Sequence, residues 1–193
     1  ASKANNKVFN ALIENGVYYE TSLEDSSILF GNKDAKMRVT ILSNPHCNPC
    51  ARMHKRVENL LQISDQAICV QYIFSSFNKE LEDSSRYLIY KYFGNTQDKA
   101  LKEFDLWYSK EKYEYNSILR RNSTLIYTKM IETEMAKHEK WRKRTSLIET
   151  PTILVNGYKL PKEYSIEDLA MLTSCNIIYL ISAPHSLYFF ITS

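Results

Sequence analysis

Two cysteines separated by two residues, Cys47 and Cys50, form the motif of this sequence that is best suited to chemistry. They follow an apolar, β-branched segment at 38–42 and precede a helical pattern of apolar residues at 53–61. This order predicts a buried strand, the thiol pair and then a helix. Unpaired N–H groups and the dipole at a helix start favour a thiolate. We therefore expect Cys47, the more exposed thiol, to be the nucleophile, and Cys50 to resolve the disulfides that it forms.

The residues around the two cysteines support this interpretation. Pro49 suits the first turn of a helix, because the N–H group that proline lacks would have no intrahelical partner there. Positive charge near the motif would favour the thiolate further. The basic residues close to it are His46, Arg52, His54 and Lys55.

A zinc site is the structural alternative for the cysteine pair. Such a site would need two more Cys or His ligands at suitable spacing. The other two cysteines, Cys69 and Cys175, are isolated in the sequence, which disfavours both zinc and a disulfide between them. Cys69 lies in an apolar segment, where we expect a buried and inert thiol.

Thr150-Pro151 is the second position of interest, because it immediately precedes an apolar, β-branched segment at 152–155. Proline cannot donate to a strand ladder, so it belongs at the first residue of a strand, and a cis bond is compatible with this place. This dipeptide alone is a weak signal, since most X-Pro bonds are trans.

The elements that would position these residues form a strand–helix–strand unit, a long helical block, a hairpin and a closing helix. Asn156-Gly157 is a strong hairpin signal, and Ser165 is a candidate N-cap of the closing helix. The predicted strands lie at 28–32, 38–42, 68–74, 152–155 and 158–160.

The segment 79–149 contains no proline and one glycine, and its apolar residues recur at helical spacing. It predicts several helices with breaks near Gly94-Asn95 and Arg121-Asn122. Its tyrosines could line a peptide groove, although helix packing is the preferred interpretation; they include Tyr87, Tyr90, Tyr92, Tyr108, Tyr113 and Tyr115. We expect His138 at the surface and Trp141 in the core.

Composition excludes other classes of function. The chain has four glycines, and they are not clustered, so it lacks the fingerprint of dinucleotide binding and the loop of nucleotide hydrolysis. The net charge of +3 comes from 25 basic and 22 acidic residues, a balance that does not indicate nucleic acid. The densest basic run, 137–144, includes Glu139 and reads as a solvated helix face.

Together these motifs resemble the thioredoxin superfamily, and more closely its DsbA-like branch. The segments that carry the resemblance read LFGNKDA at 29–35, NPHCNPCARM at 44–53 and TPTILVNGYKLP at 150–161. They are similar to the thioredoxin domains attached to bacterial vitamin K epoxide reductase homologues. The resemblance covers about 28–172 and implies an α/β class: a thioredoxin fold with a helical insertion between the CxxC half and the cis-Pro hairpin half.

The resemblance also implies roles for single residues. Cys47 would attack and Cys50 would resolve, Pro151 would be the cis-proline, and the backbone of Thr150 would pair with substrate. His46 and Pro49 would support the active site, His46 where thioredoxins often have tryptophan. Ile41 stands where many members carry a buried carboxylate that relays protons to the second thiol. No cofactor or metal is implied.

The expected domain organisation has four parts. They are an N-terminal extension at 1–27, a thioredoxin-fold core at 28–78 and 150–175, the helical insertion at 79–149 and an apolar tail at 176–193. No Asp, Glu, Lys or Arg follows Asp168. The preferred interpretation of the tail is an added hairpin or strand, and the rivals are a membrane-proximal segment or a non-native extension.

The expected function is thiol–disulfide exchange with cysteine-containing proteins in the bacterial periplasm or another extracytoplasmic space, coupled to a membrane partner or domain of the vitamin K epoxide reductase type. The chain begins at Ala1 without a signal-like stretch, so we expect a processed form or a fragment of a membrane-anchored protein. The alternatives are a reductase or isomerase of the same fold, and a non-enzymatic binding module with a structural or metal-loaded CxxC.

Overall fold

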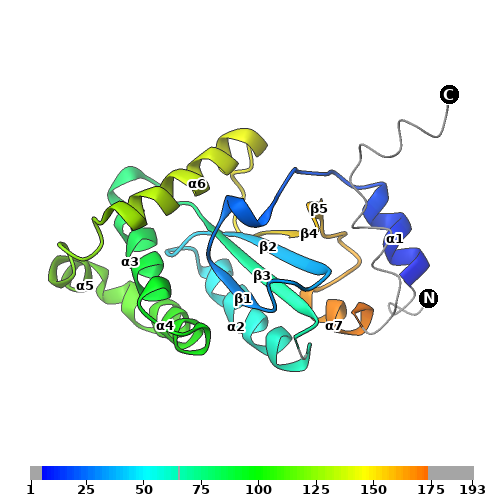
Figure 1. The fold of residues 1–193 in the computed structure, drawn as a ribbon, viewed down its shortest axis with the longest axis horizontal. Coiled ribbons are helices and arrows are strands. Elements are labelled where there is room, and N and C mark those ends of the chain that lie inside the picture. The colour runs from blue at the N-terminus through cyan, green and yellow to red at the C-terminus, as the bar shows by residue number, and fades with distance from the viewer. Residues whose placement is uncertain (1–5, 65, 174–193) are drawn as a thin grey trace.

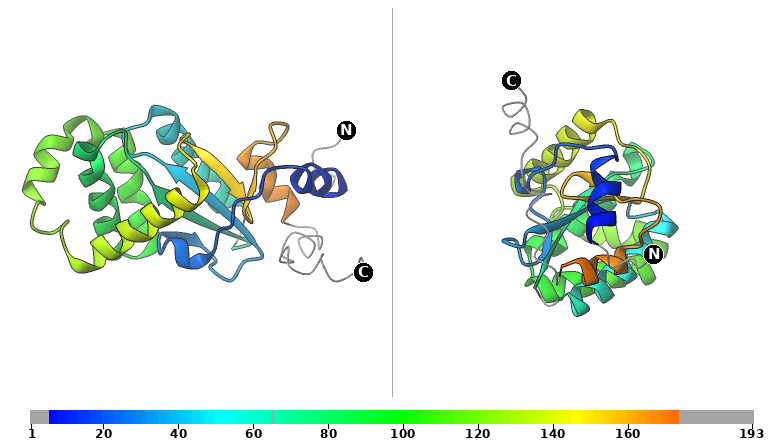
Figure 2. Two further views of the ribbon diagram at one scale, coloured as in Figure 1. Left: turned by 90° about the horizontal axis from the view of Figure 1, so that it is seen from above. Right: turned by 90° about the vertical axis from the view of Figure 1, so that its right-hand side faces the viewer.

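The computed structural model describes residues 6–64 and 66–173, and the predicted tail at 176–193 lies outside them. A five-stranded mixed sheet occupies the centre, with helices on both faces (Figures 1 and 2). The strands are β1 (Leu29–Gly31), β2 (Met37–Ser43), β3 (Ile68–Phe74), β4 (Thr152–Val155) and β5 (Tyr158–Lys159). The α-helices are α1 (Asn6–Glu14), α2 (Asn48–Ile63), α3 (Glu82–Phe93), α4 (Gln97–Ser109), α5 (Tyr115–Arg121), α6 (Lys129–Thr145) and α7 (Leu169–Leu172). The predicted α/β class is confirmed.

The sheet has the strand order β1-β3-β2-β4-β5, with β2 and β3 parallel and the other neighbours antiparallel. Every residue of β3, and all but one of β2, is buried, which explains their nearly continuous apolar and β-branched sequence. Figure 2 (right) shows α6 on one side of the sheet and α2 with α7 on the other. The central strand β2 ends at Ser43, and α2, the helix that carries the cysteine pair, begins at Asn48, after a short connection.

The hairpin of β4 and β5 turns at Asn156 and Gly157, as the sequence predicts. Both turn residues have positive φ angles, 47° and 88°, which asparagine and glycine tolerate best. A Cβ atom on Gly157 would lie 2.6 Å from a ring carbon of Tyr18. The glycine is therefore required by the close approach of the N-terminal segment as well as by the turn.

Helices α3–α6 join β3 to β4, with ends near the predicted breaks. Helix α3 ends before Gly94 and α5 ends before Asn122. These helices share one hydrophobic core with the sheet, because Phe104 and Trp107 of α4 belong to the same buried cluster as Val39 and Val70. Five of the seven tyrosines of this segment are buried or pack against that core, and Tyr113 and Tyr127 are exposed, which supports the packing interpretation.

The predicted surface position of His138 is wrong, whereas Trp141 is buried as expected. The backbone N–H of Phe74 donates to Nδ1 of His138 at 3.1 Å, and Nε2 lies 3.0 Å from a carboxylate oxygen of Glu134. Two polar residues one helical turn apart thus satisfy each other inside the protein. A pattern of polar residues on a charged helix does not reveal this pairing.

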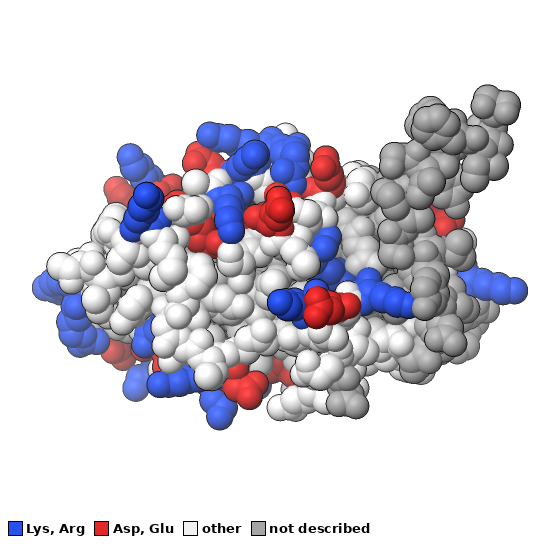
Figure 3. Space-filling view, viewed as in Figure 1, with Lys and Arg blue, Asp and Glu red and all other residues white. Residues whose placement is uncertain are grey.

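The basic run 137–144 on α6 does not form a surface patch of positive charge alone. Lys143 pairs with Glu139 on the same helix at 2.9 Å, and Arg144 pairs with Asp25 at 2.8 Å. Figure 3 shows acidic and basic side chains interspersed along the upper edge, where α6 lies. Within the described residues, no helix is long and apolar enough to span a membrane.

Candidate active site

Cys47 is the N-cap residue of α2, and Pro49 lies in the first turn. The Cys47 sulfur accepts a hydrogen bond from the backbone N–H of Cys50, with a distance of 3.3 Å between Sγ and N. Cys47 is 5% exposed and Cys50 is 1% exposed. The expected order of exposure is correct, although both thiols are largely covered. The cap position gives the Cys47 sulfur an N–H donor that stabilises negative charge.

The Thr150–Pro151 peptide bond is cis, and β4 begins directly after it. The thiol of Cys47 donates to the carbonyl oxygen of Thr150, with 3.6 Å between Sγ and O. Antiparallel pairing of β2 with β4 places Leu42 opposite Thr152. This register brings together two motifs that are far apart in the sequence.

The Cys50 thiol is held away from solvent. Burial, followed by contact with Cys47, raises its pKa to about 11 even though the backbone N–H of Asn44 donates to its sulfur at 3.4 Å. Near neutral pH the Cys50 thiol therefore keeps its proton. Ile41, where the family often has a carboxylate, is buried in β2 opposite Ile153 and offers no proton acceptor.

Side chains from the helical segment 79–149 hold the loop before and within the CxxC motif. Each contact joins one residue of 43–48, from the end of β2 to the start of α2, to one residue of α3, α4 or the following 3₁₀ turn, Glu111–Glu114. The four contacts are Ser43 with Tyr108 (2.7 Å), Pro45 O with Trp107 Nε1 (2.9 Å), His46 with Ser84 (2.6 Å) and Asn48 Oδ1 with Lys112 Nζ (2.7 Å). The sequence does not reveal these partners, because a helical pattern does not show which distant residues the helix will contact.

His46 is not the cation that the sequence suggested. Its imidazole is half-buried and lies edge-on to the rings of Trp107 and Tyr115, with centroids 5.7 and 4.9 Å away. Burial, followed by the nearby charge of Lys112, lowers the pKa of His46. The ring is therefore neutral at neutral pH, and the ammonium of Lys112 supplies the positive charge beside the loop.

The other predicted cations lie further along α2. Arg52 is exposed, and Lys55 reaches carboxylates of Glu58 and Asp105 instead of the thiols. His54 is buried, and its Nδ1 lies 2.7 Å from the hydroxyl of Tyr72. Cys69 is buried in β3, and burial raises its pKa to about 11, so it is the inert thiol that the sequence predicts.

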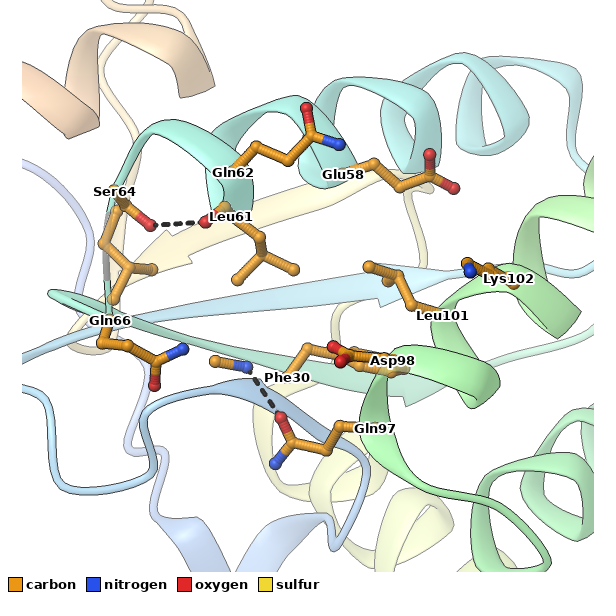
Figure 4. Close-up of a pocket in the computed structure, with 12 residues that line it drawn as sticks. Phe30, Glu58, Leu61, Gln62, Ser64, Gln66, Gln97, Asp98, Leu101 and Lys102 are labelled. Carbon is orange, nitrogen blue, oxygen red and sulfur yellow. Dashed lines mark hydrogen bonds between the residues drawn. The ribbon is translucent and has the colours of Figure 1, made fainter.

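Of two pockets in the described residues, one lies at the cis-proline and the other does not. A pocket of about 190 Å³ is lined by Pro151, Thr152 and the residues 159–162 that follow β4. A larger pocket of about 340 Å³ lies between α2, β1 and α4 (Figure 4), and neither Cys47 nor Cys50 lines it. Within 6–64 and 66–173, neither cysteine of the pair joins two further Cys, His, Asp or Glu ligands that could share a metal ion.

A family model described as Thioredoxin matches residues 23–173 of this chain. No curated protein sequence matches it. Among solved structures, a proposed protein-disulfide isomerase from Pseudomonas syringae superposes with a TM-score of 0.62 at 14% identity, covering 78% of this chain and 98% of that one. BdbD from Bacillus subtilis in its oxidised form gives a TM-score of 0.60 at 12% identity, covering 83% and 97%.

Reduced DsbA1 from Neisseria meningitidis gives a TM-score of 0.56 at 12% identity, covering 83% of this chain and 86% of that one. At these identities the likeness shows the fold, a thioredoxin-like sheet with the helical arrangement of DsbA structures. The predicted thioredoxin fold is confirmed.

Proposed function

Because this chain belongs to the Thioredoxin family, as the match over 23–173 shows, we propose that it is a thiol–disulfide oxidoreductase that acts on cysteine-containing proteins. Cys47 is the attacking thiol and Cys50 the resolving thiol. The observation that carries this proposal is the position of the Cys47 sulfur between the backbone N–H of Cys50 and the carbonyl of Thr150. At this position the N–H of Cys50 stabilises a Cys47 thiolate, and the backbone at Thr150 offers a segment beside which a substrate can lie.

The exchange follows from the different surroundings of the two sulfurs. In the oxidised pair, a substrate thiolate attacks Sγ of Cys47, the Cys47–Cys50 bond breaks, and Cys50 leaves as a thiolate. Cys50 then takes up a proton, because its pKa is about 11 in these surroundings. A second substrate thiolate attacks the substrate sulfur of the mixed disulfide, and Cys47 leaves as a thiolate. Two electrons have passed from the substrate to the cysteine pair.

The segment before the cis-proline is suited to hold the substrate. The carbonyl of Thr150 lies against Cys47, and Ile148, two residues earlier, is 90% exposed. The neighbouring pocket is lined by Pro151 and residues 159–162. An extended peptide can pair with the backbone at Thr150 and place an apolar side chain on Ile148.

The proposed place of action is the bacterial periplasm or another extracytoplasmic space, where disulfides persist. The partner that accepts or supplies electrons is a membrane protein or attached domain of the vitamin K epoxide reductase type. This part of the proposal rests on the resemblance of the three motif segments.

The test is a pair of assays, reduction of insulin and oxidation of a reduced protein substrate, on single-cysteine variants. Cys47→Ser should lose both activities, and Cys50→Ser should accumulate a mixed disulfide with the substrate. Cys69→Ala is the matched control, because that thiol is buried away from the pair, and it should keep both activities. Full activity of Cys47→Ser would contradict the assignment.

Two further measurements separate the alternatives. Stoichiometric zinc in the reduced protein that is lost in Cys50→Ser would favour a binding module. The reduction potential of the pair distinguishes an oxidant from a reductant, because DsbA-like and thioredoxin-like values differ by about 150 mV.

A further inference from the structure

Three ligand groups from two helices meet beside α2. His54 and Glu58 are four residues apart on α2, so they lie on one face of the helix, and Asp105 approaches from α4. Their ligand atoms all lie within 4.8 Å of one another. Nε2 of His54 lies 3.4 Å from Oε1 of Glu58. None of the three takes part in the thiol chemistry proposed above.

The buried imidazole has one nitrogen without a hydrogen bond. His54 is 1% exposed, and its Nε2 atom has no hydrogen-bond partner among the described residues. The other ring nitrogen, Nδ1, lies 2.7 Å from the hydroxyl of Tyr72. When Nδ1–H donates to Tyr72, Nε2 presents a lone pair toward the Glu58 carboxylate. Two electron-rich atoms at this distance favour a cation between them.

We propose that His54, Glu58 and Asp105 form a binding site for a divalent transition-metal ion of the Zn²⁺ type. One imidazole and two carboxylates suit such an ion, whereas Mg²⁺ and Ca²⁺ prefer oxygen ligands alone. Zinc bonds of about 2.0–2.2 Å in a tetrahedron separate neighbouring ligand atoms by roughly 3.4 Å. The His54–Glu58 distance already has this value. The contact of Nδ1 with Tyr72 orients the imidazole as metal-bound histidines require.

In the structure, the ammonium of Lys55 contacts both carboxylates of this cluster. It lies 3.3 Å from Oε2 of Glu58 and 3.6 Å from Oδ1 of Asp105. The Lys55 side chain is 63% exposed, so it can turn into solvent when a metal ion binds. The ammonium therefore competes with the metal, and its removal makes the site more available.

The ion has a route to the cluster. Glu58 lines the pocket of about 340 Å³ between α2 and α4, and Figure 4 shows it at the same end of that pocket as Lys102. A bound ion would link α2, which begins at the cysteine pair, to α4, whose Trp107 and Tyr108 hold the loop before that pair.

Titration calorimetry with Zn²⁺ at pH 7 tests the site on the full chain with the Cys47–Cys50 pair oxidised, so that these thiols cannot bind the metal. We expect one ion per chain. Asp105→Asn should weaken binding at least tenfold. Asp98→Asn is the matched control, since it removes the same charge from the exposed start of the same helix, and it should leave the affinity unchanged.

A second pair of variants tests the competing ammonium. Lys55→Met should tighten Zn²⁺ binding at least threefold, whereas Lys102→Met, which removes a neighbouring exposed charge from α4, should not. Circular dichroism confirms that each variant is folded. Absence of saturable binding, or equal affinities of Asp105→Asn and the unchanged protein, overturns the proposal. A loss in Asp98→Asn as large as that in Asp105→Asn overturns it as well, because it would show attraction by general charge only.

Discussion

The ammonium of Lys112 donates a hydrogen bond to the side-chain carbonyl of Asn48, with Nζ and Oδ1 2.7 Å apart. Asn48 lies between the two cysteines, and Lys112 belongs to the helical segment that separates β3 from β4. Only 6% of Lys112 is exposed, so its charge is poorly screened by water. The helical segment thus places a buried cation on Asn48, inside the CxxC motif.

Replacing Lys112 by methionine should slow the reaction of Cys47 with iodoacetamide at pH 7. The variant loses the cation and the hydrogen bond to Asn48, a change of about 1 kcal/mol that corresponds to roughly a fivefold lower rate. Mass spectrometry of the Cys47 peptide measures the rate. Lys110→Met is the control, because Lys110 is exposed and should have no effect. Equal rates for Lys112→Met and the unchanged protein would show that Lys112 does not support the thiolate.

The Cys50 thiol should react only in alkaline solution. Burial is the larger cause of its raised pKa of about 11, and contact with Cys47 adds to it. In the variant Cys47→Ser, the alkylation rate of Cys50 should therefore be low at pH 8 and still rise above pH 9. A rate that levels off near pH 8, the behaviour of a free thiol, would rule out the buried position of Cys50.

Two buried tryptophans provide a matched pair of substitutions. Trp107 donates from Nε1 to the carbonyl of Pro45 at 2.9 Å, and Trp141 donates to the hydroxyl of Thr21 at 3.0 Å. Each change to phenylalanine removes one buried hydrogen bond and should lower the free energy of unfolding by about 1–3 kcal/mol. Denaturant titration measures this loss.

The two variants should differ in disulfide exchange at a temperature where both are folded. Trp107→Phe frees the carbonyl just before the CxxC motif and should reduce the exchange rate, whereas Trp141→Phe should not. Similar losses of activity in both variants would indicate a general effect of stability.

Acid should destabilise the protein through Glu134. Burial alone would raise the pKa of Glu134, but hydrogen bonds from His138 and from the N–H of Ser27 lower it to about 2. The folded state therefore favours the carboxylate, and this stabilisation is complete above about pH 4.5 and lost as the pH falls toward 2. It amounts to roughly 2 kcal/mol. Burial lowers the pKa of His138, so the pair is a carboxylate with a neutral imidazole.

Unfolding curves between pH 2 and 7 test this assignment. Glu134→Gln should flatten the fall in stability at acid pH. Glu167→Gln is the control: the Glu167 pKa is also about 2, because of the hydrogen bonds with Arg56, but this pair is exposed, and exposed pairs contribute little. An equal flattening in both variants would contradict the role of burial at Glu134.

The sequence alone determined the features that depend on neighbouring residues. The cysteine spacing and Pro49 predicted a thiol pair at the start of α2, Asn156-Gly157 predicted the hairpin, and the apolar runs predicted the strands. Caps, turns and strand runs are set by interactions over a few residues. The motif resemblance added the cis-proline and the fold, both of which are confirmed.

Only the tertiary structure decided what surrounds the thiols. It made His46 neutral, brought Lys112 to Asn48, placed the carbonyl of Thr150 beside Cys47, and buried His138 against Phe74. These contacts join residues that are distant in the chain. Helical periodicity tells which face of a helix is buried and not which partner covers it, because the partner depends on strand register and on how separate helices pack.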